Sequence, residues 1–271
     1  LDTLEYRANK KASFATLELT KTIEKPIDRF KVLVTGKDKA GDFYRKNFAS
    51  MFQYCSNRIP EITDAFYKID DAMKAGFGWE NGPFEIWDAI GIEKGIELMK
   101  AEGYQPASWV TDMVASGNTS FYSIKDGATH FYSITNKKVE KIPGQDAFII
   151  LNNIRESKKI WNNSDSIITD LGDGIINLEF TSKMNSIGAG VLQGINKAID
   201  IAEKDYNGLV IGNQGANFSV GANLGMIFMM AVEQEYDELN MAIKMFQDTM
   251  MRCRYSAIPV IAAPHGMTLG G

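Results

Sequence analysis

The first half of the chain carries apolar residues at a spacing of three to four, which is typical of amphipathic helices. In residues 38–56, Phe48 and Phe52 fall on one face together with Cys55. Glycine or proline interrupts this pattern at short intervals. Further helices are predicted over residues 61–75, 84–90, 92–101 and 107–115. This half is therefore predicted to be an all-helical domain.

The pattern changes after residue 119. Residues 120–124 and 129–134 alternate and are rich in aromatic and β-branched residues, and a turn dipeptide, Asp126-Gly127, lies between them. This arrangement predicts a β-hairpin appended to the helices. The polar stretch 137–144 contains Pro143 and is expected to be a linker. We therefore expect one domain over residues 1–145 and a second over residues 146–271.

In the second half, short apolar runs alternate with amphipathic stretches, which predicts a βαβ-type α/β domain. Strands are predicted at residues 148–151, 166–170, 174–180, 208–211 and 259–263, and helices at 186–204, 224–232 and 236–255. Residues 224–232 are apolar almost throughout, which favours a buried helix. The methionine-rich stretch from Met241 to Met251 is expected to be adaptable core.

Two glycine-rich loops follow the last two predicted strands, one over residues 212–221 and one over residues 265–271. Loops at the ends of neighbouring parallel strands lie side by side. The backbone N–H groups of Ala222 and Gly271 could then converge on one oxygen, as a thioester enolate or a tetrahedral oxyanion requires. An oxyanion hole and a plain strand-to-helix turn both fit this spacing.

Other candidate residues have simpler interpretations. We expect His265 to fix its loop by a hydrogen bond rather than to act as a general base, and His130 to be structural. Asp70 and Asp71 are expected at a solvated helix edge. Ser219 lacks the Gly-x-Ser-x-Gly pattern of a nucleophile elbow. No Cys/His pair has metal-ligand spacing, so no metal is predicted.

Composition narrows the function classes. The formal net charge is −5 and the basic residues are scattered, which argues against nucleic-acid binding. Cys55 and Cys253 are far apart in the sequence and are expected to be free thiols in a reducing compartment. The sequence has no run of membrane-spanning length and no apolar leader segment, so we expect a cytoplasmic protein. The chain starts at Leu1 without methionine and stops at Gly271, which we expect of a fragment.

Two motifs in the second half resemble the enoyl-CoA hydratase (crotonase) family. They are Asn217-Phe-Ser-Val-Gly-Ala-Asn-Leu and Ile258-Pro-Val-Ile-Ala-Ala-Pro-His-Gly-Met-Thr-Leu-Gly-Gly. The resemblance covers residues 160–271 and implies about the N-terminal half of a crotonase-like ββα spiral domain. It implies that Ala222 and Gly271 supply the oxyanion-hole N–H groups for an acyl-CoA thioester. Asn223 stands where the family usually has Asp, and the family's water-activating glutamate lies beyond the glycine run.

Three motifs in the first half resemble the helical C-terminal domain of 3-hydroxyacyl-CoA dehydrogenase over residues 12–120. They are Asn57-Arg, Ile69-Asp-x-Ala-Met and Gly82-Pro-Phe-Glu. The domain order resembles the fused, dehydrogenase-first proteins of fatty-acid β-oxidation, in which the helical domain occurs twice. Residues 12–120 would be the second copy. Asn57 matches an asparagine that assists the dehydrogenase reaction in the first copy. In a second copy we expect it to cap the next helix.

The resemblance implies a parent protein that oxidises 3-hydroxyacyl-CoA with NAD and hydrates 2-enoyl-CoA. The NAD-binding Rossmann domain and the rest of the crotonase domain would be missing partners from the same chain, and a homodimer is possible. The fragment alone is expected to be inactive. The alternatives are a non-catalytic acyl-CoA-binding or scaffold and dimerisation module, or another crotonase-type reaction such as isomerisation or thioester hydrolysis.

Overall fold

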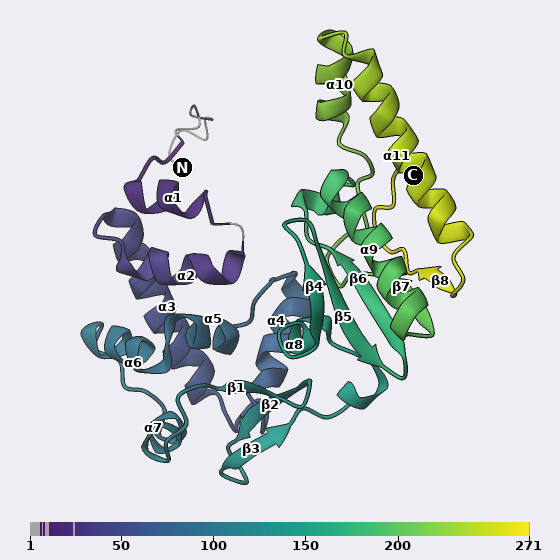
Figure 1. Ribbon diagram of the computed structural model, residues 1–271. Helices are drawn as coiled ribbons and strands as arrows, with labels where there is room; N and C mark the ends of the chain where they lie inside the picture. Colours follow the sequence, from purple (N-terminus) through teal and green to yellow (C-terminus); the bar gives the residue numbers. More distant parts are fainter. Residues whose placement is uncertain (1–5, 7, 9–10, 24, 271) are drawn as a thin grey trace. The chain divides into compact units, whose positions relative to one another are not determined.

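The structure is a computed structural model that describes residues 6, 8, 11–23 and 25–270. The chain divides into two compact units (Figure 1), the first made of residues 1–125 and 129–143, and the second of residues 126–128 and 144–271. Each unit has its own hydrophobic core.

The described part of the first unit combines seven helices with a three-stranded sheet in the order β1-β2-β3. The elements are α1 Ala15–Thr20, α2 Pro26–Thr35, α3 Lys39–Asn57, α4 Tyr67–Phe77, α5 Pro83–Ile90, α6 Ile92–Ala101, α7 Ser108–Ala115, β1 Tyr122–Lys125, β2 Ala128–Ser133 and β3 Lys138–Lys141. The predicted helical character and the hairpin are both confirmed.

Helix α3 is anchored at its start by Asp38. The Asp38 carboxylate accepts from the Gly41 N–H at 3.0 Å, as an N-cap residue does. It also accepts from the backbone N–H and the hydroxyl of Thr16, at 2.9 and 2.8 Å. Backbone donation from Thr16 and Gly41 lowers the pKa of Asp38 to about 2. The same carboxylate therefore caps α3 and ties α1 to it.

The core of the first unit is built from aromatic rings. Trp87 is wholly buried and stacks on Phe52, with ring centroids 4.7 Å apart. The Trp87 indole N–H donates to the Ile92 carbonyl at 3.1 Å, which satisfies its polar atom. Gly95 packs so closely on the indole that a Cβ there would collide with it. Burial of such side chains stabilises the fold by about 1.5–3 kcal/mol each.

Two segments of this unit differ from prediction. The helix expected over residues 61–75 begins only at Tyr67, because the Thr63 hydroxyl accepts from the Ala65 N–H at 3.3 Å and favours a turn there. The expected linker 137–144 contains β3, which pairs antiparallel with β2. Its polar composition suits a strand with an open edge.

The described part of the second unit contains a five-stranded sheet in the order β4-β5-β6-β7-β8. The elements are α8 Leu151–Ile154, β4 Lys159–Asn162, β5 Ser166–Gly172, β6 Ile175–Phe180, α9 Ala189–Asp205, β7 Gly208–Ile211, α10 Leu224–Val232, α11 Tyr236–Arg254 and β8 Val260–Ala262. Strands β4 to β6 are antiparallel, whereas β6, β7 and β8 are parallel. The predicted α/β character is confirmed.

Helix α9 packs against the sheet and forms the core of this unit with it. Ile168 and Leu178 on the strands and Ile195 and Ile199 on the helix are all buried. Helix α11 packs on α9, and the Asn196 side chain of α9 donates to a hydroxyl of α11 at 2.9 Å. The sheet, α9 and α11 are therefore successive layers.

Three predictions for the second unit are wrong in whole or in part. Residues 148–151 form no strand, since α8 begins at Leu151. Helix α10 forms where expected, but it has no buried residue, and Leu224 and Phe228 are 75% and 66% exposed. The methionine-rich helix α11 is core only in part: Met250 packs against the core of this unit, whereas Met241, Met245 and Met251 are exposed. The reason is that the α10–α11 pair extends beyond the sheet (Figure 1), so that α10 packs mainly on α11.

Candidate functional site

The two glycine-rich loops lie side by side, as the parallel order of β7 and β8 predicts. The Phe218 N–H donates to the His265 carbonyl at 2.9 Å, and the Ser219 N–H donates to the Met267 carbonyl at 3.1 Å. The Leu269 N–H donates back to Ser219 at 3.0 Å. The loops therefore continue the strand pairing beyond the end of the sheet.

This pairing brings the second loop next to Ala222. Gly221 has a φ of +84°, and a Cβ there would lie 2.5 Å from the Leu269 carbonyl oxygen. Gly270 has a φ of +67°, and a Cβ built on it would lie 3.6 Å from the Ala222 nitrogen. Both positions therefore need glycine, and Gly270 lies beside the Ala222 amide. Gly271 lies outside the described residues, so its contribution of a second N–H stays a prediction.

The Ala222 N–H is available to donate a hydrogen bond to a ligand. The carbonyl before it, on Gly221, accepts from the Ile187 N–H at 2.8 Å and fixes the turn. The Ala222 N–H itself donates to no group in the part of the chain that the structure describes. A free backbone donor at a fixed position is one half of an oxyanion hole.

Helix α10 begins directly after this donor. The Asn223 side-chain oxygen accepts from the Met226 N–H at 3.2 Å, so Asn223 is the N-cap of α10. An asparagine fills this capping role as well as an aspartate. The positive end of the α10 dipole lies at the same place and favours negative charge nearby.

A polar network holds the first loop in place, and the sequence did not reveal it. The buried Ser219 hydroxyl donates to the Asn185 carbonyl at 2.7 Å and accepts from the Gly221 N–H at 3.0 Å. The Asn217 side-chain oxygen accepts from the Met267 N–H at 2.8 Å. Ser219 therefore supports the turn before Ala222, whereas sequence reasoning considered it only as a nucleophile.

The expectation that His265 fixes its loop by a hydrogen bond is confirmed. Its Nε2–H donates to the Gly215 carbonyl at 2.8 Å, which links the two glycine-rich loops. The ring proton is assigned to Nε2 because a carbonyl oxygen can only accept a hydrogen bond. Within the described residues, no group of three His, Cys, Asp or Glu side chains is placed to hold a metal ion.

Asn57 lies apart from these loops in the sequence, at the end of α3. Its side-chain N–H donates to the Gln53 carbonyl of the same helix at 2.8 Å, and the residue is exposed. The expectation that it caps the following helix is wrong, because α4 begins ten residues later, at Tyr67. A catalytic role for Asn57 stays a prediction.

Asp70 is not at a solvated edge, contrary to expectation. It is wholly buried, and its carboxylate accepts from the N–H groups of Phe84 and Glu85, at 2.9 and 3.0 Å, and from the Tyr122 hydroxyl at 2.8 Å. Burial raises the pKa of Asp70 to about 7, although these donors oppose the rise. The reason for burial is that Gly82 has no side chain to cap α5, so Asp70 supplies the acceptor. Asp71 is exposed, as expected.

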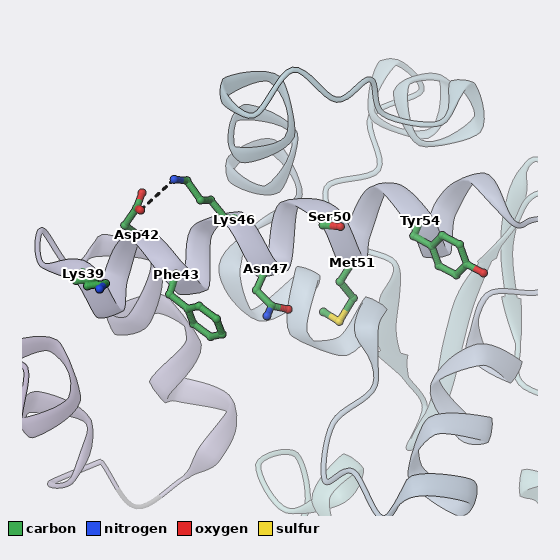
Figure 2. Close-up of a pocket in the computed structure, with 8 residues that line it drawn as sticks. All are labelled: Lys39, Asp42, Phe43, Lys46, Asn47, Ser50, Met51 and Tyr54. Atoms are coloured by element: carbon green, nitrogen blue, oxygen red, sulfur yellow. Dashed lines mark ion pairs between the residues drawn. The ribbon is translucent and has the colours of Figure 1, made fainter. Parts of the chain in front are cut away.

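A surface hollow of about 670 Å³ follows one face of α3. Figure 2 shows its lining residues, Lys39, Asp42, Phe43, Lys46, Asn47, Ser50, Met51 and Tyr54. The Asp42 and Lys46 side chains form an ion pair at 3.1 Å, which raises the pKa of Lys46. Lys39 is the third charged residue of the lining, so the hollow carries a small excess of positive charge.

The described residues do not fit an NAD site. A dinucleotide site needs a tight glycine turn that leads from a strand directly into a helix. Residues 181–188 separate β6 from α9, and a paired loop from Gly212 to Asn223 separates β7 from α10, so neither connection leads directly into its helix. Among the helices that the structure describes, none is both long and apolar enough to cross a membrane.

Comparison with known proteins gives a family match in the first unit. Residues 35–127 match the family model of the 3-hydroxyacyl-CoA dehydrogenase C-terminal domain. A Bacillus subtilis (strain 168) protein named "Probable 3-hydroxyacyl-CoA dehydrogenase" is 41% identical over 270 residues, which cover 99% of this chain and 34% of that protein. A Rickettsia felis protein named "Putative fatty acid oxidation complex trifunctional enzyme" is 26% identical over 231 residues, covering 85% of this chain and 29% of that protein.

The chain thus spans about one third of the length of these relatives. Among solved structures, an enoyl-CoA hydratase from Bacillus anthracis is similar with 20% identity and a TM-score of 0.34, over 38% of this chain and 40% of that chain. The helical first half of this protein therefore contains a domain of the 3-hydroxyacyl-CoA dehydrogenase C-terminal type, within a chain homologous to a longer protein of that name.

Proposed function

We propose that the chain is an internal part of a larger bifunctional β-oxidation protein that oxidises 3-hydroxyacyl-CoA with NAD and hydrates 2-enoyl-CoA. The family match over residues 35–127 and the names of the longer relatives support the dehydrogenase part. The crotonase motifs around Ala222 and Gly270 support the hydratase part. NAD would bind elsewhere in the larger protein, and no step involving NAD is assigned to this chain.

The observation that carries the proposal is the convergence of the two loops beside an unpaired N–H. A thioester carbonyl oxygen placed there would accept from Ala222 and, in the proposal, from Gly271. Both donors and the positive end of α10 would stabilise negative charge as it develops on that oxygen. This chain would bind and polarise the acyl-CoA, and the acid–base groups of the hydration step would come from another part of the protein.

A binding experiment tests the site. Calorimetry with acetoacetyl-CoA should show binding to the chain, and Ala222→Pro, which removes the N–H, should weaken it by about tenfold or more. Ala222→Ser keeps the N–H and should bind as the unchanged protein does. Equal binding by the proline variant would contradict the oxyanion hole.

Activity assays test whether the two reactions need other parts of the larger protein. We expect neither NADH formation from 3-hydroxybutyryl-CoA nor hydration of crotonyl-CoA by the chain alone. Either activity at a rate typical of enzymes, about 1 per second or faster, would contradict the proposal. The same assays on the full-length protein provide the positive control.

One observation favours a second candidate function, a non-catalytic scaffold or dimerisation module. Helix α10 exposes Leu224, Phe228 and Val232, and monomeric proteins seldom expose a large continuous apolar surface. Concentration-dependent association in sedimentation experiments, without any acyl-CoA binding, would favour this alternative. Binding that is lost in Ala222→Pro would favour the enzyme part.

A further inference from the structure

A third loop, residues 181–188 between β6 and α9, lies against the first glycine loop. Two consecutive residues in it, Met184 and Asn185, have φ values of +56° and +54°. This left-handed region is unfavourable for residues other than glycine, and least so for asparagine and aspartate. Two such residues in succession persist only where surrounding contacts hold them, as is common beside functional sites. The contacts of this loop therefore indicate what its conformation serves.

Ser182 closes the third loop on itself. The Asn185 N–H donates to the Ser182 carbonyl at 2.8 Å, and the Ser182 hydroxyl donates to the Ser186 carbonyl at 2.7 Å. These hydrogen bonds join the residues on the two sides of Asn185. The left-handed conformation at Asn185 is therefore held within the third loop.

Asn185 contacts the first glycine loop at two alternate positions. Its carbonyl accepts from the Ser219 hydroxyl at 2.7 Å, and its side-chain N–H donates to the Asn217 carbonyl at 3.0 Å. The Ser219 hydroxyl is buried and also accepts from the Gly221 N–H at 3.0 Å. A continuous row of hydrogen bonds therefore joins Asn185 to the residue before Ala222.

The third loop also holds the peptide group that carries the Ala222 N–H. The carbonyl of that peptide belongs to Gly221 and accepts from the Ile187 N–H at 2.8 Å. In a trans peptide, which this one is, the C=O and N–H bonds point in opposite directions. Because the carbonyl is held toward Ile187, the Ala222 N–H points away from the third loop and stays free for a ligand.

We propose that Asn185 is a positioning residue of the oxyanion hole, which sets the direction of the Ala222 N–H without touching the acyl-CoA. This role rests on the proposed function. Asparagine suits the position for two reasons, because it tolerates the left-handed backbone and because its side-chain amide donates to the Asn217 carbonyl. Alanine has neither property, and glycine has only the first.

Isotope-edited infrared spectroscopy of bound butyryl-CoA, with 13C in its thioester carbonyl, tests this role. Hydrogen bonds to the oxygen weaken the C=O bond, so binding to the unchanged protein should lower the carbonyl stretching frequency relative to free butyryl-CoA. Asn185→Ala should lose most of this shift, and calorimetry should show an affinity for butyryl-CoA that is lower by about tenfold. Asn185→Gly keeps the backbone conformation and the carbonyl contact to Ser219, so its shift should lie between the two.

Asp173→Ala is the matched control for backbone strain. Asp173 also has a positive φ, +53°, but it lies in the turn before β6, whereas the third loop follows β6. This variant should keep the full frequency shift. The same loss of shift in Asp173→Ala as in Asn185→Ala would mean that any strained turn of this unit has the effect, and would overturn the proposal.

The remaining outcomes separate this role from the proposed function. No shift in the unchanged protein would overturn the proposed function, and the role of Asn185 with it. A full shift in Asn185→Ala, even with a weaker affinity, would mean that Asn185 only supports the fold; it would overturn the positioning role and leave the proposed function standing. If Asn185→Ala does not fold, Asn185→Gly decides, because a reduced shift supports the role and a full shift overturns it.

Discussion

The two units differ in how far their apolar helices are covered. The first unit buries a cluster of aromatic rings and the Asp70 carboxylate, and it half-buries the Asp88 carboxylate; backbone N–H groups donate to both carboxylates. The second unit has a packed core between its sheet and α9, but it exposes the apolar helix α10. The comparison shows that apolar sequence predicts helix formation, whereas burial depends on what packs against the helix.

The largest expected effect is on the aromatic core. Trp87→Ala removes a wholly buried indole that stacks on Phe52 and bonds to Ile92, and we expect it to destabilise the first unit by about 3–5 kcal/mol. Hydrogen exchange measured by mass spectrometry in increasing urea checks this unit by unit. Peptides from α9 and β6 serve as the internal control. A loss below about 1 kcal/mol would contradict a tightly packed core.

The carboxylates of Asp70 and Asp88 should make the stability of the first unit sensitive to pH. Burial raises the pKa values of Asp70 and Asp88 from 3.8 to about 7. Between these pH values the folded state binds more protons than the unfolded state, so this contribution to stability is complete below pH 4 and is lost as the pH rises through about 7. Each group contributes a slope of about 1.4 kcal/mol per pH unit.

Asp70→Asn removes one of the two titrations. We expect the loss of stability between pH 4 and pH 7 to become shallower in this variant, as measured by urea unfolding at several pH values. Asp71→Asn, at the exposed neighbour, should leave the slope unchanged. An equal slope in Asp70→Asn and the unchanged protein would mean that Asp70 stays ionised throughout this range.

Much of the fold follows from local sequence. The spacing of Phe48 and Phe52 predicts α3, and the alternation around Asp126-Gly127 predicts the β1–β2 hairpin. The predictions that were wrong depend on contacts between residues far apart in the sequence. Asp70 is buried because it caps a helix that begins at Pro83, and no local pattern contains that contact.

The candidate site is predictable only in part. Glycines at the ends of two predicted parallel strands indicated that the loops around Ala222 and Gly270 would meet, because parallel strands place their ends together. The support that Ser219 receives from Asn185 joins residues 34 positions apart. Such a pairing depends on the path of a third loop, which neither glycine motif contains.

A smaller effect is expected at the first glycine loop. Ser219→Ala removes the hydroxyl that joins Gly221 to Asn185, at an expected cost of about 1–2 kcal/mol confined to this loop. Amide exchange in residues 213–222 should then become about tenfold faster. Ser256→Ala, whose hydroxyl bonds only to carbonyls near the end of α11, is the matched control. Unchanged exchange in Ser219→Ala would show that the backbone pairing alone fixes the turn.

The smallest effect is expected where the second unit exposes apolar side chains. Phe228 is 66% exposed on α10, so Phe228→Ser removes little buried surface and should change the free energy of unfolding by less than about 0.5 kcal/mol. Urea unfolding of the second unit measures this, with Ile195→Ala in its buried core as the contrasting variant, which should cost about 2–5 kcal/mol. If Phe228→Ser destabilises the protein as much as Ile195→Ala does, then Phe228 is covered in solution, and the contrast between the two units reflects a missing contact of α10 rather than a difference in construction.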